Sequence, residues 1–239
     1  IIAGAAILNA SELRGSKLQD MKVLFSGAGA AALATARMLE DLGIPNENIW
    51  MYDIDGLVYE GRDENMFPEM ARFAQDAKHK GLPFADAFEG TDVFIGLSVG
   101  GIVNGQMLQR MNEMPVIFAM ANPIPEITYE EAKQSVPNAI IATGRSDYPN
   151  QVNNVLGFPF IFRGALDCRA RSFTFEMKRA AIQALADLAK EDVPDSVLAA
   201  YNTKRILFGP DYIIPKPFDP RVLLWVAPAV AKAAEESGV

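Results

Sequence analysis

A glycine-rich turn near the start of the chain has residue types and spacing that suit the binding of a phosphate group. Gly27, Gly29 and Ala32 form a Gly-x-Gly-x-x-Ala pattern that follows a short apolar run. The first glycine can adopt the dihedral angles of a sharp turn, and the second has no Cβ, so the backbone can approach a pyrophosphate. The alternative is that these small residues only let a helix pack closely on a sheet. The pattern alone does not distinguish the two.

An acidic residue at the end of a second apolar run favours the phosphate interpretation. The segment 49–53 is predicted to be a strand that ends at Asp53, about 20 residues past the turn, where a carboxylate can accept hydrogen bonds from an adenosine ribose. The helix predicted after the turn would direct its free N–H groups at the phosphates. Turn and acid together predict a nucleotide-binding site.

The elements that must position these residues alternate between strands and helices. Strands are predicted at 22–26, 49–53, 93–98, 115–120 and 139–143. Helices are predicted at 1–13, 30–42, 67–80, 105–111, 128–134, 158–170, 172–190 and 219–237. Each strand is an unbroken apolar run, which is typical of a parallel sheet covered on both faces. We therefore predict an α/β, Rossmann-type, doubly wound parallel sheet with additional C-terminal helices, in one domain over 1–239.

Small or polar residues follow each of the predicted strands. Besides the turn and Asp53, these are Ser98 with Gly100 and Gly101, Asn122 with Pro123, and the segment 144–147. In an open parallel sheet, ligands bind outside the carboxyl ends of the strands. Any one of these could be ordinary loop chemistry, but five at one predicted edge favour a binding site.

An asparagine-rich segment follows the last predicted strand. The amides of Asn153 and Asn154 offer two donors and one acceptor each, which suits a carboxylate or hydroxyl of a small acid, and Asn122 could act in the same way. The alternative is that one of the pair caps a turn. Arg145 pairs either with a substrate carboxylate or with Asp147.

Composition excludes several classes of function. The chain of 239 residues has a net charge of −8, one cysteine and one histidine. The acidic balance argues against nucleic acid as a partner, and no apolar run is long enough for a membrane span. Cys168 cannot form an internal disulfide, and we interpret it as a semi-buried packing residue in a reducing, cytoplasmic setting. His79 is predicted to be solvated, and Arg163 to pair with Asp167 along a helix.

The residues supply a cofactor site but no catalytic set. A hydride-transfer enzyme acting on a hydroxy acid needs a base, an acid and often a metal, and beyond Asp53 the predicted edge holds no acidic cluster. The chain also begins at Ile1, in an apolar helix that lacks a capping residue. We therefore expect that a segment precedes it.

Longer motifs occur at residues 26–32, 53–56, 59–62, 121–123, 143–154, 158–165 and 214–221. Together they closely resemble those of the bacterial malic enzymes. The resemblance covers essentially the whole chain. It implies oxidative decarboxylation of (S)-malate to pyruvate and CO2, with reduction of NAD(P) and a Mg or Mn ion. In that family the metal carboxylates and the catalytic tyrosine and lysine precede the part that matches this chain. The resemblance therefore implies the NAD(P)-binding domain alone, without catalytic or metal residues and inactive by itself.

The resemblance also implies roles for individual residues. The pyrophosphate would be held by Gly27, Gly29, Ala31 and Ala32, and the adenosine ribose by Asp53. The nicotinamide ribose would lie along Ser98 and Asn122, and nicotinamide or malate would contact Asn122, Asn153 and Asn154. Ile54 and Asp55 stand where NADP-using relatives carry a small polar and then a basic residue. Because an acid repels a 2′-phosphate, we expect NAD rather than NADP.

Partners follow from the same resemblance. They would be NAD, malate or pyruvate, the absent N-terminal domain, and further copies of the chain in a homo-oligomer. Two alternative functions stay open. One is a non-catalytic, NAD-binding regulatory module, and the other is malolactic-type decarboxylation of malate to lactate with bound NAD.

Overall fold

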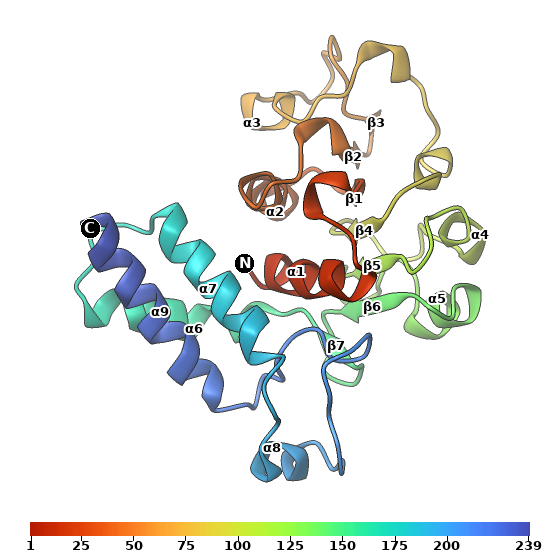
Figure 1. The fold of residues 1–239 in the computed structure, drawn as a ribbon. Helices are drawn as coiled ribbons and strands as arrows, with labels where there is room; N and C mark the ends of the chain where they lie inside the picture. Colours follow the sequence, from red (N-terminus) through yellow and green to blue (C-terminus); the bar gives the residue numbers. More distant parts are fainter. The chain divides into compact units, whose positions relative to one another are not determined.

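The computed structural model describes all residues, 1–239, and divides them into two compact units. The sheet unit comprises Arg14–Gly144, and the helical unit combines Ile1–Leu13 with Arg145–Val239. Figure 1 shows the ribbon of both. The single domain predicted over 1–239 stays a prediction.

The apolar runs of the sheet unit form one largely parallel sheet. Its parallel strands are β1 (Val23–Ser26), β2 (Ile49–Asp53), β4 (Val93–Gly96), β5 (Val116–Ala119) and β6 (Ile140–Thr143). The spatial order is β2-β1-β4-β5-β6, so successive strands are added first on one side of β1 and then on the other. This reversal opens a crevice beyond the carboxyl ends of β1 and β4, where open α/β sheets bind their ligands.

Helices cover the sheet unit, as predicted. Figure 1 shows α2 (Ala30–Asp41) and α3 (Pro68–Ala71) on one side of the strands, with α4 (Gly105–Leu108) and α5 (Tyr129–Ser135) on the other. Residues of α4 and α5 join the strands in one buried cluster rich in aromatic side chains. The α/β fold class is therefore confirmed, and its strands lie within one or two residues of their predicted bounds.

The helix predicted over 67–80 is wrong. Only α3 and a single 3-10 turn at Ala77–His79 form there. Between them Gln75 returns to the sheet edge, where its N–H donates to the Val58 carbonyl at 3.0 Å and its side-chain amide to the Ile49 carbonyl at 2.8 Å. These hydrogen bonds to backbone carbonyls outweigh the helical propensity of the segment. A short antiparallel strand, β3 (Gly56–Leu57), was also not predicted.

His79 is not the fully solvated residue that we expected. It is half-buried, and its ring meets the Trp50 ring edge-on with 4.8 Å between centroids. The lysines on either side of it are exposed, and it was these neighbours that favoured a solvated histidine. Sequence periodicity alone cannot show that a histidine between two exposed lysines packs its ring against a tryptophan.

The helical unit is built on three packed helices. These are α6 (Phe158–Asp167), α7 (Phe175–Leu188) and α9 (Arg221–Ser237), and α9 lies against both of the others. Gly164 permits this approach, because a Cβ there would lie 2.3 Å from the Ala227 carbonyl oxygen. The unit also contains α1 (Ile2–Arg14) up to residue 13, a two-residue strand β7 (Asn150–Gln151), and α8 (Asp195–Ala200), which is not among the predicted helices.

Buried asparagines join segments of the helical unit that are distant in sequence. The amide of Asn9 donates to the carbonyls of Ala186 and Ile213, each at 2.9 Å. Asn150 donates to the Pro210 carbonyl at 2.8 Å and accepts the Ile213 N–H at 3.0 Å. Each asparagine satisfies backbone groups that burial would otherwise leave without a partner.

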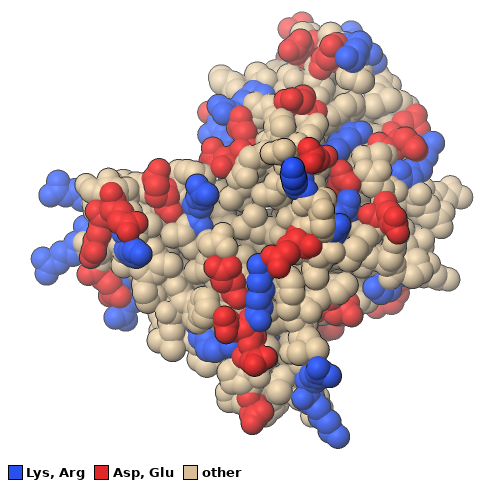
Figure 2. Space-filling model, in the orientation of Figure 1, with Lys and Arg blue, Asp and Glu red and all other residues tan.

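Charges are mixed on the molecular surface. Figure 2 shows acidic and basic side chains interspersed on the face in view, with no extended field of one sign. None of the helices combines the length and the apolar run that a membrane crossing would need.

Candidate functional site

The turn after β1 requires glycine at its first position. Gly27 has a φ of +106°, and a Cβ there would lie 2.7 Å from the Leu97 carbonyl oxygen. Its N–H donates to the Tyr52 carbonyl at 2.7 Å, which holds the turn to β2. The turn therefore passes close to the loop after β4, and any side chain at Gly27 would force the two apart.

The start of α2 is open to a ligand. Gly29 is its N-cap residue, no side chain caps the helix, and a Cβ at Gly29 would meet nothing within 4 Å. Ala31 is exposed beside this opening, whereas Ala32 is buried and lets the helix pack on the sheet. Uncapped N–H groups and the positive end of the helix dipole favour an anion. The geometry fits a pyrophosphate.

Small-molecule sites usually measure about 300–1,000 Å³, and the crevice beside the turn measures 690 Å³. Gly27, Asp53 and Ser98 all line it, which brings together three residues that the sequence placed at one edge. Its apolar side includes Tyr52, Leu82, Phe84 and Ile102. No lysine or arginine lines the cavity, whereas two carboxylates, those of Asp53 and Asp55, do.

Asp53 has a protein partner that the sequence analysis missed. The buried guanidinium of Arg62 donates to both carboxylate oxygens of Asp53, at 3.0 Å to Oδ1 and in a shorter contact to Oδ2. This hydrogen bond raises the pKa of Arg62, although burial opposes it. Oδ1 also accepts the Asp55 N–H at 2.9 Å. Asp53 is therefore not reserved for a ribose, although Oδ2 retains a lone pair for one further hydrogen bond.

Arg62 has no donor to spare. Its Nε donates to the Glu64 carbonyl at 3.0 Å, and Nη1 also contacts the carbonyls of Gly56 and Leu57 at 3.3 and 3.2 Å. Its side chain is 1% exposed. The Tyr-Glu-Gly-Arg segment at 59–62 was noted in the sequence, but only the folded chain shows that its arginine reaches Asp53.

Ser98 and Asn122 lie at neighbouring strand ends. The hydroxyls of Ser98 and Ser26 are 2.7 Å apart, and Ser26 directly precedes Gly27. Asn122 is exposed just beyond β5, which pairs with β4. Both residues are therefore accessible on the ligand-binding edge of the sheet unit.

The predicted asparagine pair divides into a capping residue and an exposed one. Asn153 is half-buried, and its side chain accepts the Val155 N–H at 3.0 Å. Asn154 is exposed and lines a mainly apolar hollow of 400 Å³ in the helical unit, together with Phe158 and Phe162. The capping alternative is thus correct for Asn153, and Asn154 is accessible to a ligand.

The Arg163 ion pair and the cysteine environment are found as predicted, and of the two alternatives for Arg145 the structure shows the pair with Asp147. Arg145 donates to Asp147 at 2.9 and 2.6 Å, and Arg163 to Asp167 at 2.8 Å. Cys168 is half-buried, with its thiol 3.3 Å from the Gly164 carbonyl oxygen. The structural alternative therefore accounts for these residues.

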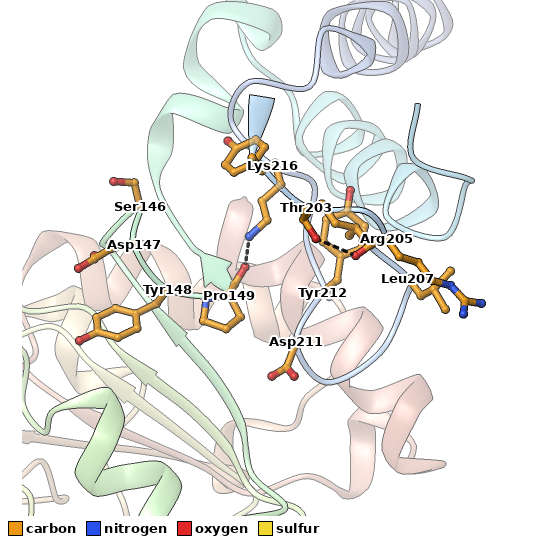
Figure 3. A pocket seen from close by; sticks show the side chains of 12 residues that line it. Ser146, Asp147, Tyr148, Pro149, Thr203, Arg205, Leu207, Asp211, Tyr212 and Lys216 are labelled. Carbon is orange, nitrogen blue, oxygen red and sulfur yellow. Dashed lines mark hydrogen bonds between the residues drawn. The ribbon is translucent and has the colours of Figure 1, made fainter. Parts of the chain in front are cut away.

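The helical unit has a second pocket that the sequence analysis did not identify. It measures 460 Å³ and lies between the segment 146–149 and the segment 201–216 (Figure 3). Lys216 extends to the Pro149 carbonyl at 2.5 Å, and burial lowers the pKa of its ammonium group. Tyr201, Arg205 and Asp211 also line the pocket. Because cationic and anionic side chains both line it, no single class of ligand is favoured.

A metal site is not evident in this chain. No group of three or more histidine, cysteine, aspartate or glutamate side chains lies close enough together to hold an ion. The expectation that metal ligands and catalytic groups lie outside these residues stays a prediction. The site described above fits a dinucleotide, with a glycine and a carboxylate in one crevice and an open helix start directly after the glycine turn.

Known proteins with similar sequences and structures identify the family. A family model described as the malic enzyme NAD binding domain matches residues 1–202. An NAD-dependent malic enzyme and an NADP-dependent malic enzyme, both from Rhizobium meliloti (strain 1021), are 54% and 52% identical over 239 residues. Each match covers 100% of this chain and 31% of the relative.

A solved structure agrees with the sequence matches. The crystal structure of a malic enzyme from Pyrococcus horikoshii is 36% identical, with a TM-score of 0.85, and the match covers 100% of this chain and 53% of that one. The chain thus spans about a third to a half of the length of these relatives. On the extent and level of these matches, the chain belongs to the malic enzyme NAD-binding domain family.

Proposed function

We propose that this chain binds NAD in the crevice of the sheet unit and serves as the cofactor domain of a malic enzyme. The open start of α2 beside Gly27 carries the proposal. It combines a turn that only glycine can form with helix N–H groups that no side chain caps. The confirmed family makes a dinucleotide the expected anion.

The residues of the crevice would each act on a different part of the dinucleotide. The N–H groups that follow Gly29 would hold the pyrophosphate, and Oδ2 of Asp53 would accept a ribose hydroxyl. Apolar side chains such as Phe84 and Ile102 would keep water from the adenine. When bound, the nicotinamide ring supplies the hydride acceptor for the oxidation of an alcohol. Ser98 and Asn122 would orient the nicotinamide half of the molecule.

The charge of the crevice supports NAD over NADP. A 2′-phosphate needs a cation close by, and the cavity is lined by two carboxylates and no lysine or arginine. The nearest guanidinium, that of Arg62, is fully engaged by Asp53 and backbone carbonyls. Relatives named for either cofactor match this chain, so family membership does not decide between NAD and NADP. We therefore base the choice on the residues that line the crevice. Asp55 is the residue that we expect to contribute most.

The reaction of the whole enzyme would be oxidative decarboxylation of (S)-malate to pyruvate and CO2. We infer that the Mg or Mn ligands and the acid–base pair lie outside residues 1–239. Within the chain, the exposed residues Asn122 and Asn154 would contact nicotinamide or malate, whereas the side-chain oxygen of Asn153 is engaged as a cap. The exposed apolar stripe of Phe158, Phe162 and Leu166 on α6 would be covered by the remaining part of the enzyme or by a second copy. We also propose a reducing, cytoplasmic setting, because the single cysteine cannot form an internal disulfide.

Calorimetric titration of the 239-residue chain with NADH tests the cofactor site, and an assay of the complete enzyme tests the reaction. Saturable binding by the chain is expected. With malate, NAD and Mn²⁺, the complete enzyme should form NADH and pyruvate in equal amounts. Lactate without net NADH would instead indicate the malolactic alternative. NADH binding without any turnover of malate would indicate a regulatory module.

A further inference from the structure

A fully buried carboxylate lies between the ends of β4 and β5, where the nicotinamide half is proposed to bind. Glu126 is 0% exposed. Its Oε1 accepts the Ser98 N–H at 3.0 Å, and its Oε2 accepts the Ala121 N–H at 3.1 Å. A buried carboxylate is costly unless hydrogen bonds satisfy it. These two bonds therefore make Glu126 a clip between the loop after β4 and the loop after β5.

The surrounding backbone is shaped to admit this side chain. A Cβ on Gly96, the last residue of β4, would lie 2.2 Å from the carboxyl carbon of Glu126. The same two loops are joined by backbone hydrogen bonds from Gly101 to Pro125 and from Val103 to Glu126, each 3.0 Å. The loops are thus already joined without the carboxylate. The side chain of Glu126 adds two further hydrogen bonds, which fix the backbone of each loop at Ser98 and at Ala121.

One end of the clip binds a residue proposed to contact the cofactor, and the other end binds the neighbour of such a residue. One oxygen holds the N–H of Ser98 itself, whose hydroxyl is 2.7 Å from that of Ser26 beside the glycine turn. The other oxygen holds the N–H of Ala121, which directly precedes Asn122. Asp53 and the start of α2 have no contact of this kind with Glu126. The clip therefore contacts the loops proposed to hold the nicotinamide half and makes no hydrogen bond to Asp53 or to the start of α2.

We propose that Glu126 is a positioning residue that fixes Ser98 and Asn122 for the nicotinamide half of the bound dinucleotide. The inference rests on the proposed NAD binding. The adenosine half depends on the glycine turn, the start of α2 and Asp53. Substitution of Glu126 should therefore weaken the binding of the whole dinucleotide but not the binding of a nucleotide that contains only its adenosine half.

The test compares NADH with AMP, which contains only the adenosine half, by calorimetry on the 239-residue chain. Glu126→Gln keeps the shape but turns an NH2 group toward one of the two N–H donors. We expect NADH to bind about tenfold more weakly, since a hydrogen bond to a charged group is lost, whereas AMP affinity is unchanged. Glu131→Gln is the matched control, because Glu131 also accepts a backbone N–H, from Gly105 at 3.2 Å, but is exposed.

The outcomes separate this inference from the function on which it rests. If the unsubstituted chain binds neither NADH nor AMP, the proposed NAD site is wrong. If it binds both, and Glu126→Gln weakens neither or weakens both equally, the positioning role is wrong. Glu126→Asp keeps the charge but cannot span both N–H groups, so a selective loss of NADH affinity is expected there too. That variant decides the question if the glutamine variant does not fold.

Discussion

The two units use polar and small residues in opposite ways. In the sheet unit, the candidate ligand site is formed largely by backbone, at Gly27 and at the uncapped start of α2. In the helical unit, polar side chains such as Asn9 and Asn150 are consumed by internal hydrogen bonds. Small residues therefore form the candidate ligand site in one region, whereas buried amide side chains link distant segments of the chain in the other.

The largest effect should come from filling the glycine turn. Gly27→Ala places a Cβ 2.7 Å from a backbone oxygen at a φ of +106°, so NADH affinity should fall by about 100-fold or more, with strain of about 1–3 kcal/mol. Calorimetry and thermal unfolding measure the two effects. Gly43→Ala is the control, because Gly43 has a φ of +110° but nothing within 4 Å of its Cβ. It should lose stability and keep NADH affinity. Equal affinities in both variants would contradict a site at Gly27.

The contrast between buried and exposed asparagines gives the next largest effect. Asn150→Ala leaves the Ile213 N–H and the Pro210 carbonyl without their partner in the helical unit. The free energy of unfolding should fall by about 3 kcal/mol. Asn154→Ala, at an exposed position, should change it by less than about 0.5 kcal/mol. Urea denaturation measures both. If Asn154→Ala destabilised the chain as much as Asn150→Ala does, the distinction between a buried structural asparagine and an exposed one would be refuted.

Each unit contains a tyrosine whose burial raises its pKa to about 12, Tyr52 in the sheet unit and Tyr212 in the helical unit. The unfolded side chain ionises near its ordinary value of 10.0. The folded state therefore binds more protons between these values, and stability falls as the pH rises through this window. Either Phe variant should remove about 2 kcal/mol of this alkaline loss. Urea denaturation at several pH values measures it. An unchanged pH dependence would contradict the burial effect.

The smallest effect concerns the charge beside the ribose site. Asp55→Asn removes one carboxylate from the lining of the crevice. NADPH should then bind roughly three- to fivefold more tightly, as expected for one partly screened charge, while NADH affinity changes little. Parallel fluorescence titrations with the two cofactors measure the ratio. Glu47→Asn, at an exposed position that does not line the cavity, should leave the ratio unchanged.

Much of the sheet unit could be predicted from sequence. Its buried strands are unbroken apolar runs, and the glycine turn has a fixed spacing to Asp53, so local pattern and tertiary structure agree. The sequence failed at 67–80, where Gln75 pairs with the sheet edge instead of continuing a helix. Such pairing depends on a backbone partner distant in sequence, which a local period cannot contain.

The charged partners of the site were the harder part to predict. Arg62 and Glu126 are both buried charges, whereas charged residues in a sequence are usually taken to be solvated. Nothing in their spacing shows that one reaches Asp53 and the other Ser98. Among the asparagines, likewise, only burial separates Asn150 from Asn154. The sequence was thus sufficient for the backbone site and insufficient for the side chains that support it.

The most direct test of the central claim is a fluorescence titration of the 239-residue chain with NADH and with NADPH under identical conditions. The account predicts saturable NADH binding and clearly weaker NADPH binding, because the crevice has two carboxylates and no cation on its lining. Tighter binding of NADPH would contradict the proposed basis of selectivity. Absence of binding by either cofactor would contradict the crevice beside Gly27 as a competent site in this chain.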